Sequence, residues 1–408
     1  MRHVFSDVRL IDGIGDTARE HLDVVVDGDR ISAVVSHGAA LPGSRSDGSG
    51  GETTLVIDRP GATLLPGLID AHAHYTFDPT EGSIAAIARR SDAEIVLMAA
   101  GHAALALHAG VTTARCAGSI RDLELVLRDA IAAGRVPGPR LIAAGSAIGI
   151  TGGHGYQFGI EADGEFELAR AVRRQVRAGA DVIKIVASEA AMLTTTGLPA
   201  GRTVHGGIEL TEPEIAAIVS EARRHRVRVM SHAQGSESVV ASARAGVDSV
   251  EHAWLADRAA IEVLAASGAF LVPTLIVTEV NRDLPGLTST QRARQDLIER
   301  HHRASCEAAV ELGIPIATGT DTGEVGVTAD LVWREVALLH EHGASPPAAI
   351  RAATSAAARL LGLDSEVGSV DTGKLADLVL VDGDPIADLA RLASPHLVMQ
   401  GGRIVHGA

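Results

Sequence analysis

The stretch Leu65-Pro66-Gly67-Leu68-Ile69-Asp70-Ala71-His72-Ala73-His74 decides the fold and the chemistry of this chain. It begins with Pro-Gly, continues as an apolar run of strand length and ends in His-Ala-His. Side chains alternate between the two faces of a strand, so His72 and His74 point the same way. Imidazole binds zinc and similar divalent ions well, and the pair therefore indicates a metal site. The alternative is two unrelated surface histidines in a chain that has 18 histidines.

The composition bounds the class of protein. A chain of 408 residues can form one large catalytic domain and a small one. Hydrophobic residues make up 46% and aromatic residues 2%, so Ala, Val, Leu and Ile must build the core of a globular protein. The net charge of -15 argues against nucleic acid and anionic membranes as partners. The two cysteines, Cys116 and Cys306, are too few for a disulfide framework or a cysteine-based zinc site. We expect no signal peptide and no membrane span, and therefore a cytoplasmic protein.

The middle of the chain alternates apolar runs of strand length with helical patterns, as βα units do. The first predicted strand ends at His74, and the others are 111–116, 140–145, 181–187, 227–232, 248–252, 270–274 and 314–321. Eight strands with helices between them predict an α/β fold of the (β/α)8 TIM-barrel type. Two further helices are predicted at about 328–342 and 346–361.

Both ends of the chain have a different pattern, with short strands and turns. Asp12-Gly13 and Asp27-Gly28 separate apolar runs near the N-terminus, which is a hairpin signal. Strand patterns return at 377–383 and 397–405. The simplest arrangement pairs the two ends in one small β-sandwich domain. We therefore predict residues 1–62 and 366–408 as the two parts of that domain and 63–365 as the barrel.

Polar residues with metal-binding side chains recur at the ends of the predicted barrel strands. His72, His74, His232, His252 and Asp321 occupy such positions, and the C-terminal strand ends of a barrel of this kind meet at one mouth, where the active site lies. Four histidines and an aspartate at one mouth predict a metal site. The alternative treats each as an ordinary polar residue at a strand end, which requires five independent coincidences.

Lys184 lies in the fourth predicted strand among apolar neighbours. Burial of an ammonium group is costly and lowers its pKa. A neutral amine reacts with carbon dioxide to form a carbamate, which is an anion that can bridge two metal ions. A lysine whose ammonium group extends to the strand end is the equally weighted alternative.

Several segments, in this order, resemble those of the amidohydrolase superfamily, in its imidazolonepropionase-like and prolidase-like branch. They cover nearly the whole chain: 66–74, 110–113, 182–184, 231–233, 251–252, 272–274, 319–321 and 373–378. The resemblance implies that His72, His74 and Asp321 hold one divalent ion of the zinc type. It implies that His232 and His252 hold a second ion, and that carboxylated Lys184 bridges the two.

The same resemblance implies roles in catalysis and in substrate binding. Asp321 would act as general base and then as general acid. His154, in a glycine-rich loop after the third strand, would contact the substrate carbonyl, with Tyr156 close by. Arg202 and His205, after the fourth strand, could bind a substrate carboxylate or be solvated loop residues. Tyr75 could line the mouth or pack in the core.

These observations predict a binuclear zinc-type hydrolase of amide bonds. Its small-molecule substrate would be a dipeptide, an N-acyl amino acid or an aryl amide of the ochratoxin kind. One alternative is a cyclic amide hydrolase or deaminase of the imidazolonepropionase type with one metal. A non-catalytic scaffold is another, which the complete set of ligand residues disfavours. We expect a homo-oligomer because related proteins form larger assemblies.

Overall fold

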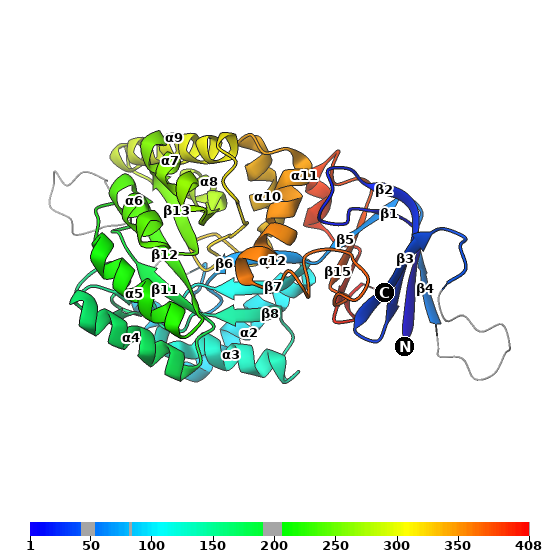
Figure 1. Ribbon diagram of the computed structural model, residues 1–408, viewed down its shortest axis with the longest axis horizontal. Helices are drawn as coiled ribbons and strands as arrows, with labels where there is room; N and C mark the ends of the chain where they lie inside the picture. The colour runs from blue at the N-terminus through cyan, green and yellow to red at the C-terminus, as the bar shows by residue number, and fades with distance from the viewer. Residues whose placement is uncertain (42–53, 81–83, 191–205, 408) are drawn as a thin grey trace.

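Parallel strands alternate with helices through the middle of the computed structural model, which describes residues 1–41, 54–80, 84–190 and 206–407 (Figure 1). The strands that form the barrel wall are β6 (Leu68–Ala73), β7 (Val111–Cys116), β8 (Arg140–Ala143), β11 (Val182–Val186), β12 (Arg228–Gly235), β13 (Ser249–Leu255) and β14 (Phe270–Val272). Two short strands, β9 (Ile148–Gly149) and β10 (Ile160–Glu161), lie in the connection between β8 and β11.

The barrel closes through hydrogen bonds between neighbouring segments. The N–H of Asp181, just before β11, donates to the carbonyl of Ala143 in β8 at 2.8 Å. On the other side, residues 314–322 lie between β14 and β6. The N–H of Leu271 donates to the carbonyl of Pro315 at 3.0 Å, and the N–H of Ala71 donates to the carbonyl of Thr318 at 2.8 Å. The (β/α)8 architecture predicted from the sequence is therefore confirmed.

Helices cover the outside of the barrel (Figure 1). They are α1 (Ile84–Ile87), α2 (Asp92–His108), α3 (Leu123–Ala132), α4 (Gly164–Ala178), α5 (Glu212–Arg224), α6 (Ser236–Ala245), α7 (Arg258–Ser267), α8 (Leu275–Arg282), α9 (Ser289–Glu311), α10 (Val332–Glu341), α11 (Pro346–Ala352) and α12 (Ser355–Leu361), with 3-10 turns at Ile120–Asp122 and η2 (Leu389–Ala393). Local sequence sets several of their ends. Ser91 and Glu94 form a capping box at the start of α2, and Gly179 ends α4 in the left-handed conformation.

Three predicted elements differ in the structure. The predicted strand 314–321 forms only isolated bridges, at Ile316 and then at Thr322, because some of its backbone N–H groups do not bond to the backbone of a neighbouring strand. The N–H of Thr318, for example, donates to the carbonyl of Ala352 at 2.9 Å. The predicted helix 346–361 is two helices, since the carbonyls of Ala352 and Ala353 bond to the barrel instead of continuing one helix. The predicted helix 328–342 begins only at Val332.

The two ends of the chain form one sheet. Its order is β17 (Arg403–His406), β16 (Leu397–Gln400), β15 (Leu378–Asp382), β5 (Ala62–Pro66), β1 (Arg2–Leu10), β2 (Arg19–Asp27) and β3 (Arg30–Ser36), and β4 (Thr54–Asp58) pairs with β1. The first part of β1 pairs with β4 and its end pairs with β5, with an irregularity between Phe5 and Val8. Strands from both chain ends share one core, which includes Phe5, Leu64 and Leu378. The predicted β-sandwich of the two chain ends is confirmed.

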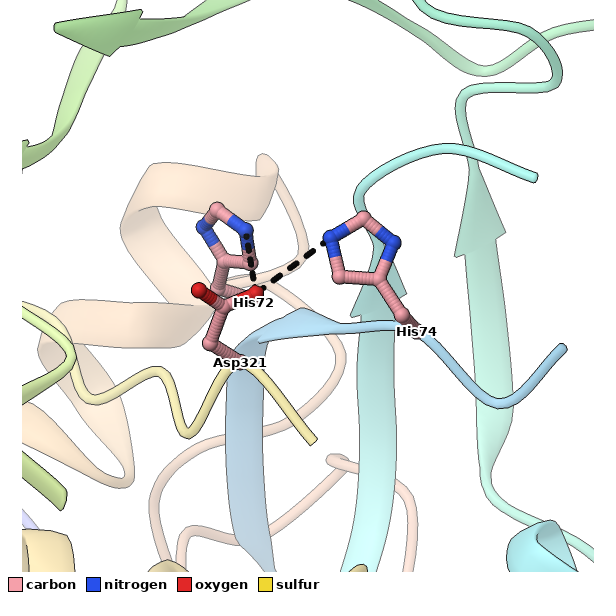
Figure 2. A group of neighbouring side chains, drawn as sticks. All are labelled: His72, His74 and Asp321. Atoms are coloured by element: carbon pink, nitrogen blue, oxygen red, sulfur yellow. Dashed lines mark ion pairs between the residues drawn. The ribbon is translucent and has the colours of Figure 1, made fainter. Parts of the chain in front are cut away.

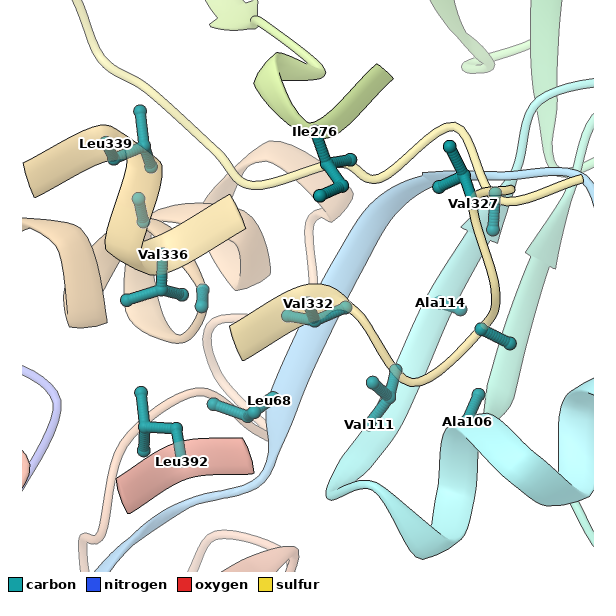
Figure 3. Packing of buried hydrophobic residues seen from close by; sticks show 14 of the residues in the cluster. Leu68, Ala106, Val111, Ala114, Ile276, Val327, Val332, Val336, Leu339 and Leu392 are labelled. Atoms are coloured by element: carbon teal, nitrogen blue, oxygen red, sulfur yellow. The ribbon is translucent and has the colours of Figure 1, made fainter. Parts of the chain in front are cut away.

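A continuous hydrophobic cluster joins the barrel wall to its covering helices (Figure 3). Leu68 of β6 and Val111 and Ala114 of β7 lie in it together with Val332 and Val336 of α10. This packing fixes β6, which carries His72, against its neighbours. Among the described residues, every helix is too short or too polar to cross a bilayer.

Candidate metal centre

His72, His74 and Asp321 meet at the C-terminal end of β6 (Figure 2). Their ligand atoms lie within 4.8 Å of one another, and all three residues are buried. The Nε2 atoms of His72 and His74 lie 3.2 and 3.3 Å from the same Asp321 oxygen, Oδ1. The backbone holds this arrangement, because the N–H of Asp321 donates to the carbonyl of His72 at 2.7 Å. Side chains that are about 250 residues apart in the sequence therefore form one cluster.

Lys184, His232 and His252 extend this cluster from β11, β12 and β13. Nζ of Lys184 lies 3.3 Å from Nε2 of His72. The ring of His252 lies 5.0 Å from that of His72 and 4.6 Å from that of His232, between centroids. No member of the group is more than 7% exposed. The six residues that were predicted as metal ligands therefore lie together, and we call them the metal-site residues: His72, His74, Lys184, His232, His252 and Asp321.

Burial sets the protonation of the cluster. It lowers the pKa of His74, and it lowers the pKa of His232 and of His252 well below the usual value of 6.5. These rings are therefore neutral at pH 7 and offer lone pairs, as a metal ligand must. Burial opposes ionisation of Asp321, but its close contacts with His72 and His74 keep the pKa of this carboxyl well below its usual value. Asp321 is therefore an anion.

Groups behind the rings fix their orientation. Nδ1 of His74 donates to the carbonyl of Gly118 at 2.8 Å, and Nδ1 of His252 lies 2.9 Å from the hydroxyl of Thr274. Such outer partners select the tautomer of a histidine ligand and hold its ring in place. Neither Gly118 nor Thr274 was among the residues predicted from the sequence. Gly118 has a φ of 131°, a conformation that favours glycine. The glycine itself was the sequence feature that could have indicated an unusual backbone at this position.

Backbone strain is concentrated at the same strand ends. The left-handed region, which is uncommon for residues other than glycine, is occupied by His252 (φ 73°), Ala253 (φ 52°), Thr274 (φ 56°) and Asp321 (φ 58°). Thr274 is β-branched, for which this conformation is especially unfavourable. Strained residues of this kind cluster at functional sites, where the surrounding structure must hold them. The strain supports a functional role for the cluster.

The donor set fits divalent metal ions. Nε2 of His232 is fully buried and has no hydrogen-bond partner among the described residues, which is costly unless the ring has another role. Neutral imidazoles, one carboxylate and one amine face each other across short distances. Imidazole and carboxylate are ligands of zinc and of similar divalent ions. The residues present are therefore compatible with such ions.

The other predicted site residues lie in different surroundings. The ring of His154, between β9 and β10, lies beside that of His232 with 4.8 Å between centroids and an interplanar angle of 35°, and burial lowers its pKa to about 4. Tyr75 is 1% exposed and packs in the hydrophobic core, which is the second of its two predicted roles. Its assignment as a substrate contact stays a prediction. Tyr156 is 52% exposed. Arg202 and His205 lie outside the described residues.

Two carboxylates near the site were not predicted. Glu209 accepts hydrogen bonds from the N–H of His154 at 2.8 and 3.1 Å, and it thereby anchors the loop that carries this histidine. Glu324 follows Asp321 in the same turn, and burial together with the charge of Asp321 raises its pKa to about 8. In the sequence both residues look like ordinary surface carboxylates.

Comparison with known proteins agrees with this geometry. Ochratoxinase of Aspergillus niger is 28% identical over 439 aligned residues, which cover 98% of this chain and 85% of that protein. The crystal structure of an Xaa-Pro dipeptidase with methionine in its active site superposes with a TM-score of 0.86, at 29% identity and 99% coverage of each chain. A prolidase complexed with N-methylphosphonate-L-proline has a TM-score of 0.85, at 27% identity and 99% coverage of each chain. The model of the Amidohydrolase family matches residues 63–405. This chain belongs to the amidohydrolase family.

Proposed function

We propose that this protein is a binuclear, zinc-type hydrolase that releases an amino acid from a dipeptide, an N-acyl amino acid or an aryl amide. The observation that carries the proposal is the convergence of the metal-site residues in one buried cluster. The names of the ochratoxinase and the Xaa-Pro dipeptidase lead to this range of substrates.

The ligands divide into two sets in this proposal. His72, His74 and Asp321 would hold one ion, His232 and His252 the other, and Lys184 both. When bound, the ions would supply a water molecule with a pKa near neutrality and would polarise the carbonyl of the scissile bond. The neutral rings and the ionised Asp321 need not lose protons at pH 7 before such ions bind.

Asp321 and His154 would act on the substrate. Asp321 is ionised, so it can accept the proton of the attacking water and then pass it to the leaving nitrogen. The ring of His154 lies beside that of His232, where it could donate a hydrogen bond to the carbonyl oxygen of the substrate. The contact of Glu209 with the backbone of His154 would keep this ring in place.

Lys184 has the surroundings that carbamate formation requires. Burial lowers the pKa of its amine to about 8, so a substantial fraction is neutral near pH 7.5. The amine nitrogen attacks carbon dioxide, a C–N bond forms and one proton leaves, which gives an anionic carbamate. Of the 36 lysines and arginines in the chain, only Lys184 and Lys374 are lysines. Arginine stays protonated and cannot undergo this reaction, which agrees with a lysine at this position.

The test is amino acid release from a panel of substrates by protein reconstituted with zinc. The panel contains dipeptides, N-acyl amino acids, aryl amides of amino acids and cyclic amides. We expect release from open-chain compounds, its loss in His72→Ala, and normal rates in His301→Ala, which changes an exposed histidine of α9. Ring opening alone would favour the imidazolonepropionase type, and activity without metal would refute the proposal.

A cytoplasmic location and a homo-oligomeric assembly are part of the same proposal. Both described cysteines, Cys116 and Cys306, are free and buried, which agrees with a reducing compartment. Size-exclusion chromatography with light scattering would measure the assembly, and a monomer would contradict it.

A further inference from the structure

A buried ion pair crosses the barrel interior beneath the metal-site residues. Arg115 of β7 is 2% exposed and Glu251 of β13 is 0% exposed. Nη2 of Arg115 donates to both carboxylate oxygens, at 2.9 and 3.1 Å. The arginine also donates through Nε to the carbonyl of Ala71 at 2.6 Å and through Nη1 to the hydroxyl of Ser249 at 3.0 Å. The hydroxyl of Ser249 in turn donates to Glu251.

This pair is unusual for its position. Layers of apolar side chains normally fill a barrel interior, and Val182 and Met230, which belong to a buried apolar cluster, follow that rule here. Burial of two charges costs several kcal/mol per ion, and an apolar pair of similar volume is often as stable or more stable. Stability alone therefore does not account for Arg115 and Glu251.

Glu251 contacts a metal-site residue directly. Its Oε2 lies 2.7 Å from Nδ1 of His72. An ionised carboxylate can only accept, so Nδ1 carries a proton, and Nε2 is the nitrogen that a metal ion would take. That Nε2 faces Asp321 at 3.2 Å and Lys184 at 3.3 Å, which is the centre of the cluster. By contrast, the partner of Nδ1 of His74 is an uncharged group, the backbone carbonyl of Gly118.

We propose that Arg115 and Glu251 are positioning residues for His72 as a metal ligand. Glu251 fixes the tautomer and the orientation of the ring and increases the electron density on its Nε2. Arg115 binds both Glu251 and the backbone carbonyl of Ala71 in β6. It therefore holds the carboxylate of Glu251 close to His72, the residue that follows Ala71. The inference rests on the proposed function in one respect only, namely that His72 binds metal.

The alternative is a structural strut that joins β6, β7 and β13 without any effect on the metal. Three variants separate the two, namely Glu251→Gln, Arg115→Met and the double variant. Glu251→Gln leaves the buried charge of Arg115 unpaired. In the metal-free state this variant should therefore unfold at a lower temperature than the wild type. The double variant removes both charges and should recover much of that stability.

Metal affinity gives the decisive readout. We measure it by competition with a chromophoric zinc chelator, and we record the absorption spectrum of the cobalt-loaded protein. Loss of the outer carboxylate should weaken binding about 10- to 100-fold in both Glu251→Gln and the double variant. The matched control pair is Arg140 and Asp377, 2.7 Å apart, which joins the barrel to the β-sandwich. Arg140→Met with Asp377→Asn should leave metal affinity and the cobalt spectrum unchanged.

Each outcome decides the matter. Weak binding in a double variant that has regained stability supports positioning. Recovery of both stability and affinity in that variant supports the strut and overturns the inference, as does wild-type affinity in Glu251→Gln. If Glu251→Gln does not fold, the double variant carries the test alone. A wild-type protein that binds zinc tightly but cleaves no amide would refute the proposed function and leave this inference intact.

Discussion

Replacing Thr320 by valine removes one hydroxyl beneath the metal-site residues and keeps the shape of the side chain. The hydroxyl donates to Oδ2 of Asp70 at 2.6 Å. The other oxygen of Asp70 accepts from the N–H of His72 at 3.1 Å and from the N–H of Thr320 at 3.0 Å. This carboxylate therefore ties β6 to the segment that carries Asp321, and both residues of the tie are buried.

The size of the effect depends on whether Asp70 is ionised. Burial raises the pKa of Asp70 to about 6, above the ordinary value of 3.8. The folded state therefore binds this proton more tightly than the unfolded chain does, and ionisation lowers the free energy of unfolding as the pH rises from about 4 to about 6. The hydroxyl limits that loss, because its bond to a charged group contributes about 2 kcal/mol and its bond to a neutral carboxyl about 1 kcal/mol.

We expect Thr320→Val to lower the free energy of unfolding by about 2 kcal/mol at pH 8 and by about 1 kcal/mol at pH 5. Thr320→Ser keeps the hydroxyl, so its smaller loss, from one methyl group, should not change between the two pH values. Denaturant unfolding of the metal-free protein at both pH values measures these differences. An equal loss for Thr320→Val at pH 5 and pH 8, or a pH-dependent loss for Thr320→Ser, would refute the reasoning.

Three further predictions concern other parts of the molecule. Protein equilibrated with ¹³C-labelled bicarbonate should show one carbamate resonance that disappears in Lys184→Arg and persists in Lys374→Arg, whereas a resonance that persists in Lys184→Arg would contradict the carbamate. Gly319→Ala would place its Cβ 2.6 Å from Cβ of His72, and this overpacking should cost about 1–3 kcal/mol in unfolding experiments and weaken zinc binding, so unchanged values would contradict the tight contact. Burial raises the pKa of Glu335 from 4.5 to about 8, so its ionisation lowers the free energy of unfolding as the pH rises between these values, and Glu335→Gln should flatten that part of the stability profile. A slope unchanged by Glu335→Gln would refute the last of these.

The strand ends could be predicted because local rules govern them. Strand alternation places His72 and His74 on one face, and parallel strands of one barrel end at one mouth. His232, His252 and Asp321 could be placed for the same reason, without knowledge of any contact. Site residues whose positions follow from strand alternation and from the topology of the barrel can therefore be recognised in the sequence.

Long-range contacts explain what sequence patterns missed. Arg115 and Glu251 are 136 residues apart, and a polar residue within either strand pattern does not indicate its partner. The break between α11 and α12 follows from carbonyls that bond to barrel strands, which helix propensity cannot show. Each of these features depends on where another segment lies.

The number of metal ions per chain tests the central claim most directly. Metal-free protein would be reconstituted with zinc and bicarbonate, freed of excess ions and analysed by inductively coupled plasma mass spectrometry. The proposal predicts two zinc ions per chain in the wild type and fewer in Lys184→Ala, which cannot form the bridge. One ion in the wild type, with the same value in Lys184→Ala, would contradict a binuclear centre and favour the single-metal alternative.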